Sequence, residues 1–191
     1  MIALSDNAFI TPEKYLKLEE QSPIKHEYFA GEVYAMAGTT DTHNIITGNL
    51  FTPIHSHLRG SDCRVYFADI KARLEKRNRF YYPDILVTCD QRDRETPTYK
   101  NFPKLIVEVL SESTEAFDRG DKFNDYQTLD SLEEYVLVNT KHQRVEIFRR
   151  NPEGFWVLQT YTPTEETLEL QSINLTISLR ELYEDLEIPQ S

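Results

Sequence analysis

The sequence has little cysteine and no long apolar run, and each shortage excludes a class of protein. Its two cysteines, Cys63 and Cys89, match no metal-pair spacing and need no oxidising compartment, so we expect them to be buried small hydrophobic residues. No apolar run approaches the roughly 20 residues that span a bilayer. The start of the chain, residues 1–6, also lacks the basic-then-apolar form of a signal peptide. The sequence therefore predicts a cytoplasmic protein with no membrane segment.

Basic residues are also in deficit, because 21 lysines and arginines stand against 32 aspartates and glutamates, which gives a formal net charge of −11. This balance counts against non-specific binding of nucleic acid, which relies on a basic surface, but it leaves room for a local basic groove. Two basic clusters occur in the sequence: Lys71, Arg73, Lys76, Arg77 and Arg79, and then Lys141, Arg144, Arg149 and Arg150. The plainer interpretation of both clusters is a solvated strand surface.

Linkers, low-complexity tracts and internal repeats are absent, and 191 residues suffice for one α/β domain with a sizeable core. We therefore expect a single domain over residues 1–191. Hydrophobic periodicity, caps and turn residues predict its elements. The expected helices cover residues 12–22, 42–58, 111–129 and 179–186. The expected strands form an N-terminal hairpin at 26–36, a C-terminal hairpin at 144–161, and further strands at 63–74, 79–87, 105–110, 134–138 and 167–177.

Two short apolar runs each carry one carboxylate. Residues 81–87 contain Asp84, and residues 103–110 contain Glu108. Both runs are rich in β-branched residues and bounded by proline, which is typical of strands buried on both faces. A buried carboxylate without a partner is costly and normally finds a cation, a metal or a proton. If the two strands are neighbours, Asp84 and Glu108 converge and present oxygens to a hard divalent cation.

The segment after Glu108 supplies a candidate cation. Asp118, Lys122 and Tyr126 recur at spacings of four, so they line one face of the expected helix. Because that helix leaves the end of the Glu108 strand, its polar face can lean over the carboxylates, and Lys122 is the one cation so placed. The alternative is an exposed ion pair between Asp118 and Lys122, which stabilises by less than about 1 kcal/mol.

Three further residues are candidates for a supporting role. Glu27 and Glu32 are the two carboxylates of the N-terminal hairpin, and each is either an ordinary solvated strand residue or a third acidic group near the cluster. His43 lies in the first turn of the helix at 42–58, where a histidine is more often a local hydrogen-bonding residue than a ligand.

In chain order, the informative residues are Glu27, Gly31-Glu32, His43, Pro83-Asp84, Glu108-Val109-Leu110-Ser111, Ser113-Thr114, Asp118, Lys122, Tyr126 and Glu134-Tyr135. This ordered set, which extends from about residue 11 to residue 183, resembles the Uma-two family of restriction-endonuclease-like proteins. The resemblance implies the PD-(D/E)XK nuclease superfamily and its restriction-endonuclease-like fold, an α/β (α+β) mixed central sheet flanked by helices. It also implies that Asp84 and Glu108 match the metal-binding acids of that superfamily.

One position departs from the superfamily pattern, which places a lysine two residues after the second acid. Leu110 occupies that position here. Lys122 then resembles a migrated substitute, delivered from the next helix rather than from the strand.

The activity implied by the resemblance is metal-dependent hydrolysis of DNA phosphodiester bonds. A Mg²⁺ or Mn²⁺ ion held by Asp84 and Glu108 polarises the phosphate and helps to form hydroxide from water. Lys122 orients that water or stabilises negative charge in the transition state. The auxiliary residues, which contact the substrate or support the metal ligands, are Glu27, His43 and Tyr126.

Two other functions stay open at this point. The first is a catalytically degenerate nuclease fold that binds a nucleic acid or a protein without cutting, which Leu110 and the acidic net charge favour. The second is a metal site that acts on a phosphoester other than nucleic acid.

A homodimer is also expected. Nucleases of the superfamily often pair two sites across a duplex, so the resemblance points to a dimer. The C-terminal hairpin, moreover, carries more aromatic residues than one sheet face can bury, namely Phe148, Phe155, Trp156 and Tyr161. Exposed aromatic patches usually mark interfaces.

Overall fold

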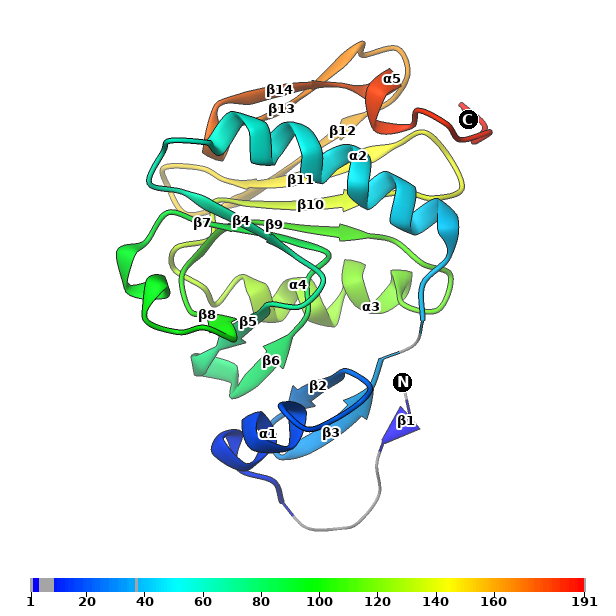
Figure 1. Ribbon diagram of the computed structural model, residues 1–191. Coiled ribbons are helices and arrows are strands. Elements are labelled where there is room, and N and C mark those ends of the chain that lie inside the picture. Colours follow the sequence, from blue (N-terminus) through cyan, green and yellow to red (C-terminus); the bar gives the residue numbers. More distant parts are fainter. Residues whose placement is uncertain (1, 4–8, 37, 191) are drawn as a thin grey trace.

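The computed structural model describes residues 2–3, 9–36 and 38–190 and arranges them in three sheets (Figure 1). The six-stranded N-terminal sheet contains, in spatial order, β1 (Ile2–Ala3), β3 (Glu32–Ala35), β2 (His26–Phe29), β6 (Arg79–Tyr81), β5 (Lys71–Leu74) and β8 (Tyr99–Lys100). The six-stranded central sheet contains β12 (Trp156–Tyr161), β11 (Val145–Arg150), β10 (Glu134–Val138), β9 (Pro103–Val109), β7 (Ile85–Thr88) and β4 (Arg64–Phe67). A separate hairpin pairs β13 (Thr167–Leu170) with β14 (Leu175–Ser178).

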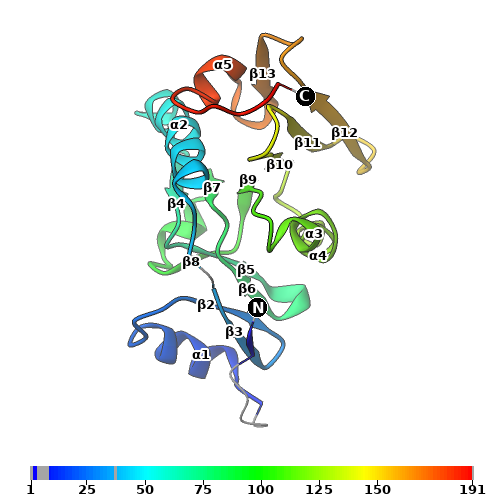
Figure 2. The same cartoon turned by 90° about the vertical axis from the view of Figure 1, so that its right-hand side faces the viewer.

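Helices cover both faces of the central sheet. The α-helices are α1 (Pro12–Glu19), α2 (Asp41–Leu58), α3 (Glu115–Arg119), α4 (Asp121–Tyr126) and α5 (Leu179–Leu182), and the 3₁₀ turns are η1 (Glu75–Arg77), η2 (Gln91–Arg94) and η3 (Gln171–Ile173). In Figure 2, α2 and α5 lie on one side of the central strands, and α3 and α4 lie on the other. Because β9 and β10 are parallel while the other neighbours are antiparallel, the predicted mixed sheet flanked by helices is confirmed.

The long helix α2 forms where its sequence pattern predicts it. Thr40 caps the helix, because its hydroxyl accepts a hydrogen bond from the backbone N–H of His43. Ile46, Leu50 and Ile54 are fully buried against the central strands and form the expected apolar stripe. The first turn of α2, which carries His43, therefore lies at a fixed place beside the sheet.

The N-terminal hairpin between β2 and β3 is also confirmed. Its turn uses two residues with positive φ, Ala30 at 47° and Gly31 at 111°. The φ of +111° strains any residue with a Cβ atom, and a Cβ atom at position 31 would also lie 2.3 Å from a ring carbon of Phe9, so the position favours glycine. The turn fixes the register in which Glu27 lies opposite Tyr34.

Three predicted elements are wrong in their continuity. The strand expected over residues 79–87 is split into β6 and β7, which belong to different sheets, so Asp84 lies between two strands rather than within one. Residues 63–74 form two strands, β4 and β5, which belong to different sheets, because the chain bends at Ala68, whose φ is +57°. The helix expected over residues 111–129 is split into α3 and α4 at Gly120, which closes α3 and precedes the first residue of α4. The break at Gly120 allows α4 to take a direction different from that of α3.

The expectation that the cysteines are separate buried residues is wrong. Cys63 and Cys89 form a disulfide, with their Cα atoms 3.9 Å apart. The antiparallel register that pairs Arg64 with Thr88 brings them opposite each other. Disulfides persist in oxidising compartments, so the cysteines no longer support the cytoplasmic expectation. In the part of the chain that the structure describes, no helix is long and apolar enough to cross a membrane.

Candidate active site

The candidate residues gather where the chain passes from the N-terminal sheet to the central sheet. Strand β6 ends at Tyr81 and β7 begins at Ile85, so Asp84 lies in the segment that joins the two sheets. Glu27 comes from β2 of the N-terminal sheet and Glu108 from β9 of the central sheet. The three acids thus meet at a junction that neither sheet could form alone.

Asp84 directly precedes β7, which is the antiparallel neighbour of β9, the strand of Glu108, so the two acids are neighbours although Asp84 itself lies outside the strand. The antiparallel register of β7 and β9 ends with Ile85 opposite Val107, so Asp84 and Glu108 are the next residues beyond this last pair. The Oδ2 atom of Asp84 accepts a hydrogen bond of 2.7 Å from the backbone N–H of Val109. This bond fixes the carboxylate beside the Glu108 strand.

Lys122 points into the cluster from α4. Its Nζ atom lies 2.8 Å from Oε1 of Glu108, 3.4 Å from Oδ1 of Asp118 and 3.6 Å from Oε1 of Glu27. The ammonium group therefore bridges acids from both sheets, as expected of a lysine delivered from the helix. Leu110, at the superfamily position for lysine, is instead buried among core residues.

Glu108 is buried and bonded at one oxygen. Its Oε1 accepts a hydrogen bond of 3.0 Å from the hydroxyl of Tyr126 and also contacts Lys122. Among the described residues, no donor makes a hydrogen bond to its Oε2. Burial raises the pKa of Glu108 well above its usual value, since it outweighs the opposing effect of Lys122, and the nearby Asp118 and Asp84 raise it further.

The cluster has more carboxylates than cations. Burial also raises the pKa of Glu27, although Lys122 and the backbone N–H of Tyr82 act against this rise. Lys122 itself has a pKa well above its usual value, because the carboxylates of Glu108, Glu27 and Asp118 outweigh the effect of its burial. One ammonium group shared among several acids leaves excess negative charge, which the site relieves by holding a proton or binding a cation.

His43 approaches Asp84 from the start of α2. Its Nε2 atom lies 3.2 Å from Oδ2 of Asp84, the same oxygen that Val109 bonds. Burial alone would lower the pKa of His43, but the hydrogen bond and charge of Asp84 outweigh it and raise that pKa. With Oδ2 occupied twice, Oδ1 of Asp84 accepts no hydrogen bond from the described residues and is the atom left for a ligand.

The structure separates the two hairpin acids and adds one acid to the site. Glu32 is exposed and accepts a hydrogen bond from the hydroxyl of Tyr34, so it lies outside the cluster. Asp118, which the sequence places only on a helix face, is buried within 3.4 Å of Lys122. The same spacing of four that singles out Lys122 could have identified it.

The two basic clusters are largely paired with carboxylates. The ion pairs are Arg73–Glu75, Lys76–Asp130, Arg77–Asp125, Arg79–Asp125, Lys141–Glu112, Arg144–Glu146 and Arg149–Glu134. Lys71 is buried and Arg149 pairs with the buried Glu134, so a solvated strand surface describes only part of each cluster. Neither cluster is a continuous unpaired basic groove.

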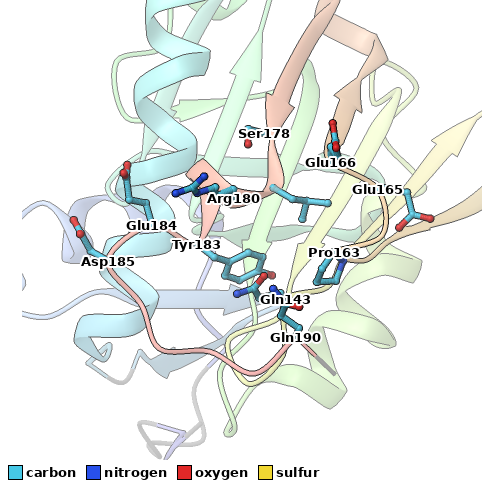
Figure 3. Close-up of a pocket in the computed structure, with 11 residues that line it drawn as sticks. Gln143, Pro163, Glu165, Glu166, Ser178, Arg180, Tyr183, Glu184, Asp185 and Gln190 are labelled. Carbon is cyan, nitrogen blue, oxygen red and sulfur yellow. The ribbon is translucent and has the colours of Figure 1, made fainter.

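An open cavity of about 670 Å³ lies away from these residues, beside α5 and the C-terminal segment (Figure 3). Its walls carry Glu165, Glu166, Arg180, Tyr183 and Glu184. None of the acids at the sheet junction lines it. The cavity therefore contributes nothing to the chemistry proposed for the junction.

The chain matches a known family over most of its length. The family Uma2, described as "Putative restriction endonuclease", matches residues 12–180. The chain belongs to the Uma2 family. This match covers every acid of the junction as well as Lys122 and Tyr126.

Similar proteins place the Uma2 chain among close relatives and a known fold. The protein slr1290 of Synechocystis is 39% identical over 189 residues, which cover 97% of this chain and 99% of that protein. A second Synechocystis protein, sll1609, is 30% identical over 161 residues, with 83% and 90% covered. A crystal structure of a "putative nuclease belonging to DUF820" from Anabaena variabilis superposes with a TM-score of 0.73 at 17% identity, over 91% of this chain and 97% of that one. The fold is thus restriction-endonuclease-like, and the family description supports a nuclease function.

Proposed function

We propose that this Uma2 protein is a metal-dependent endonuclease that hydrolyses phosphodiester bonds of DNA. The observation that carries the proposal is the buried cluster around Lys122, in which carboxylates outnumber cations. Asp84 and Glu108 each retain one oxygen without a hydrogen-bond donor among the described residues. Such a site attracts a divalent cation and, with it, a phosphate.

The residues fit Mg²⁺ or Mn²⁺ better than a metal that needs a complete protein cage. Among the described residues, no three His, Cys, Asp or Glu side chains form a metal-binding set. Mg²⁺ is commonly held by one or two carboxylates and completed by water and substrate phosphate oxygens. Asp84 and Glu108 would hold the ion. The bound ion would act as a Lewis acid on the phosphate and lower the pKa of a water.

The protein's own residues have distinct roles in this proposal. His43 and the backbone N–H of Val109 contact Oδ2 of Asp84 and so fix the orientation of this carboxylate, whose Oδ1 is left for the ion. Lys122 places a fixed positive charge beside Glu108, where it stabilises negative charge that develops on the phosphate. Tyr126 holds Glu108 in one orientation through its hydroxyl.

A catalytically degenerate fold is the second candidate, since Leu110 replaces the superfamily lysine. The position of Lys122 favours the enzyme over this alternative, because the ammonium group is restored from α4 at 2.8 Å from Glu108. A protein that only binds nucleic acid would have no need to bury that charge.

The decisive experiment incubates supercoiled plasmid with the purified protein in Mg²⁺ or Mn²⁺, with EDTA as the blank. We expect nicking or linearisation that depends on the metal and disappears in Asp84→Asn and Glu108→Gln. Plasmid that stays intact while the protein still retards DNA in a gel would support the degenerate binder. Hydrolysis of bis(p-nitrophenyl) phosphate without any DNA cleavage would point to a small phosphoester as substrate.

A further inference from the structure

Strand β12 is an open edge of the central sheet. It pairs with β11 on one side, and no other strand of the described residues pairs with its second side. An unpaired edge presents backbone N–H and C=O groups that can template another strand. Figure 2 shows β12 at the margin of the sheet, beyond β11.

The backbone groups that point outward can be identified. In the turn before β12, the N–H of Asn151 donates to the carbonyl of Phe155 at 2.8 Å, so this is a hydrogen-bonded pair of the β11–β12 ladder. Hydrogen-bonded and non-hydrogen-bonded pairs alternate along an antiparallel ladder. The pairs that contain Trp156, Leu158 and Thr160 are therefore non-hydrogen-bonded with respect to β11. Their N–H and C=O groups point to the open side.

This edge lacks the charges that usually protect one. Residues 154–161 contain no charged residue, in a chain of which 28% is charged. Phe155, Val157 and Leu158 are 70%, 52% and 49% exposed. The opposite edge strand, β4, begins with Arg64 and follows Asp62, which binds Arg94. Charged residues on an edge strand discourage pairing with another chain. Strand β12 has none, so nothing in its sequence prevents another strand from pairing with it.

We propose that β12 pairs with β12 of a second copy of this chain and joins two central sheets into one. The outward-facing groups at 156, 158 and 160 are symmetric about Leu158, so an antiparallel partner placed on a two-fold axis at Leu158 satisfies all of them. Around a two-fold axis, each residue of β12 lies opposite either the same residue of the partner strand or one a few positions away, so any charge on the strand would meet a like charge. A strand without charges is therefore suited to pair with itself, even in a chain of net charge −11.

The proposed register specifies the contacts. Leu158 meets the partner's Leu158, and Trp156 meets the partner's Thr160 on the same face of the sheet. On the other face, the exposed Val157 meets the partner's Gln159. The exposed apolar residues of the edge are thereby covered on both faces. The homodimer expected from the sequence gains a defined surface, although Phe148 and Tyr161 pack within the subunit.

The test compares Leu158→Glu with Leu18→Glu by sedimentation velocity. The protein concentration is varied over about 1–100 µM, a range that spans ordinary dimer dissociation constants. Leu18 is the matched control, since it is also 49% exposed but lies on α1. We expect wild type and Leu18→Glu to be dimers, and the Leu158→Glu dimer to dissociate at least about 100-fold more readily, because like charges meet at the axis. Circular dichroism checks that the variants remain folded.

A second variant keeps the proposal testable if Leu158→Glu misfolds. Leu158→Cys should form a covalent dimer on mild oxidation, because strand partners at the axis lie within disulfide range, whereas Leu18→Cys should not. If the wild type is a monomer at about 100 µM, the highest concentration used, the proposal is overturned. The edge would then be expected to bind an extended segment of another protein. A dimer that survives Leu158→Glu would overturn it in favour of another surface.

Discussion

Glu108 and Glu134 are buried glutamates on neighbouring parallel strands, yet their surroundings differ completely. In the β9–β10 register, Glu134 lies opposite Leu105 and Glu108 lies opposite Leu137, so the two side chains point to opposite faces of the central sheet. Glu134 is bonded by Gln171 and Ser172 of η3, which joins β13 to β14, while Glu108 contacts Lys122 and Tyr126 of α4. Figure 2 shows that the β13–β14 hairpin and α4 lie on opposite sides of the central strands. The comparison therefore isolates the effect of surroundings on the same residue type.

Glu134 is saturated with donors from this chain. Its Oε1 accepts from Arg149 Nε at 2.7 Å and from the N–H of Gln171 at 3.0 Å, and its Oε2 accepts from the N–H and hydroxyl of Ser172 at 2.9 and 2.5 Å. A carboxylate with four donors has little capacity for another ligand. Glu134 holds η3 against the sheet and is a structural residue.

Glu108 is bonded at one oxygen and shares its cation with other acids. Lys122 and Tyr126 both contact Oε1, and burial raises its pKa. The difference shows how a buried acid suited to ligand binding can be distinguished from a structural one: the donors around it do not saturate it.

The largest effect is expected from substitutions that remove a proposed metal ligand. Asp84→Asn and Glu108→Gln should each reduce cleavage of plasmid DNA on the order of 10³-fold or more, since the ion would lose one of its two protein ligands. Glu134→Gln is the matched control, and its folded fraction should cleave at the wild-type rate. Titration of Mn²⁺ by calorimetry should show weaker binding only in the first two variants. Equal losses in all three would erase the distinction between the two glutamates.

The next effect concerns Lys122. Lys122→Met keeps the aliphatic stem but deletes the charge, so cleavage should fall on the order of 10²-fold while Mn²⁺ binding persists. The free energy of unfolding at pH 8 should fall by about 3–5 kcal/mol, because Glu108 and Glu27 lose their buried cation. Lys76→Met is the control, since its pair with Asp130 is exposed to solvent and its loss should leave the free energy of unfolding nearly unchanged. Unchanged cleavage in Lys122→Met would assign the transition-state charge to another residue.

Much of this site could be predicted because its signals are local. Asp84 and Glu108 are conspicuous as carboxylates in apolar runs, and Lys122 follows from a helical spacing of four. Asp118 has the same spacing, but the sequence predicts no role for it, because its burial depends on how α3 packs on the sheet. Residue identity alone does not give that packing.

The features that could not be predicted depend on contacts between distant segments. The Cys63–Cys89 disulfide requires the pairing of β4 with β7, which residue spacing does not reveal. The bend that separates β4 from β5 uses a positive φ at Ala68, a residue type that gives no turn signal. Gly120 was the one visible indication that the helix after Glu108 is interrupted.

The third effect separates stability from activity. Glu134→Gln should lower the free energy of unfolding by about 1–3 kcal/mol, because an amide cannot accept all four hydrogen bonds and its NH₂ group faces donors. Urea unfolding at about pH 7 measures this change in the free energy of unfolding. Mn²⁺ affinity should be unaffected. A variant as stable as wild type would mean that Glu134 is not the anchor that its bonds indicate.

A smaller effect should appear in the pH dependence of stability. The folded protein retains a proton on Glu108 above its ordinary pKa of 4.5, whereas the unfolded chain has released it, so the unfolded state binds fewer protons in that window. The contribution of Glu108 to stability should therefore fall as pH rises above 4.5, by at most about 1.4 kcal/mol per pH unit, and level off above its folded pKa. The measurement is the free energy of unfolding of the wild type minus that of Glu108→Gln. It is obtained by denaturant titration at several values between about pH 4 and 9. A difference that rises with pH would contradict the assignment.

The smallest effect is expected at Tyr126, whose hydroxyl donates to Oε1 of Glu108 at 3.0 Å. Tyr126→Phe removes one hydrogen bond and should cost about 1 kcal/mol of stability, with a several-fold loss of cleavage as Glu108 gains rotational freedom. Tyr135→Phe is the matched control, because its buried hydroxyl donates to the carbonyl of Asp118 at 2.9 Å instead of to Glu108. The two variants should lose similar stability, but only Tyr126→Phe should weaken Mn²⁺ binding. If both weaken it equally, the tyrosine acts through packing, and Glu108 is held in place by Lys122 alone.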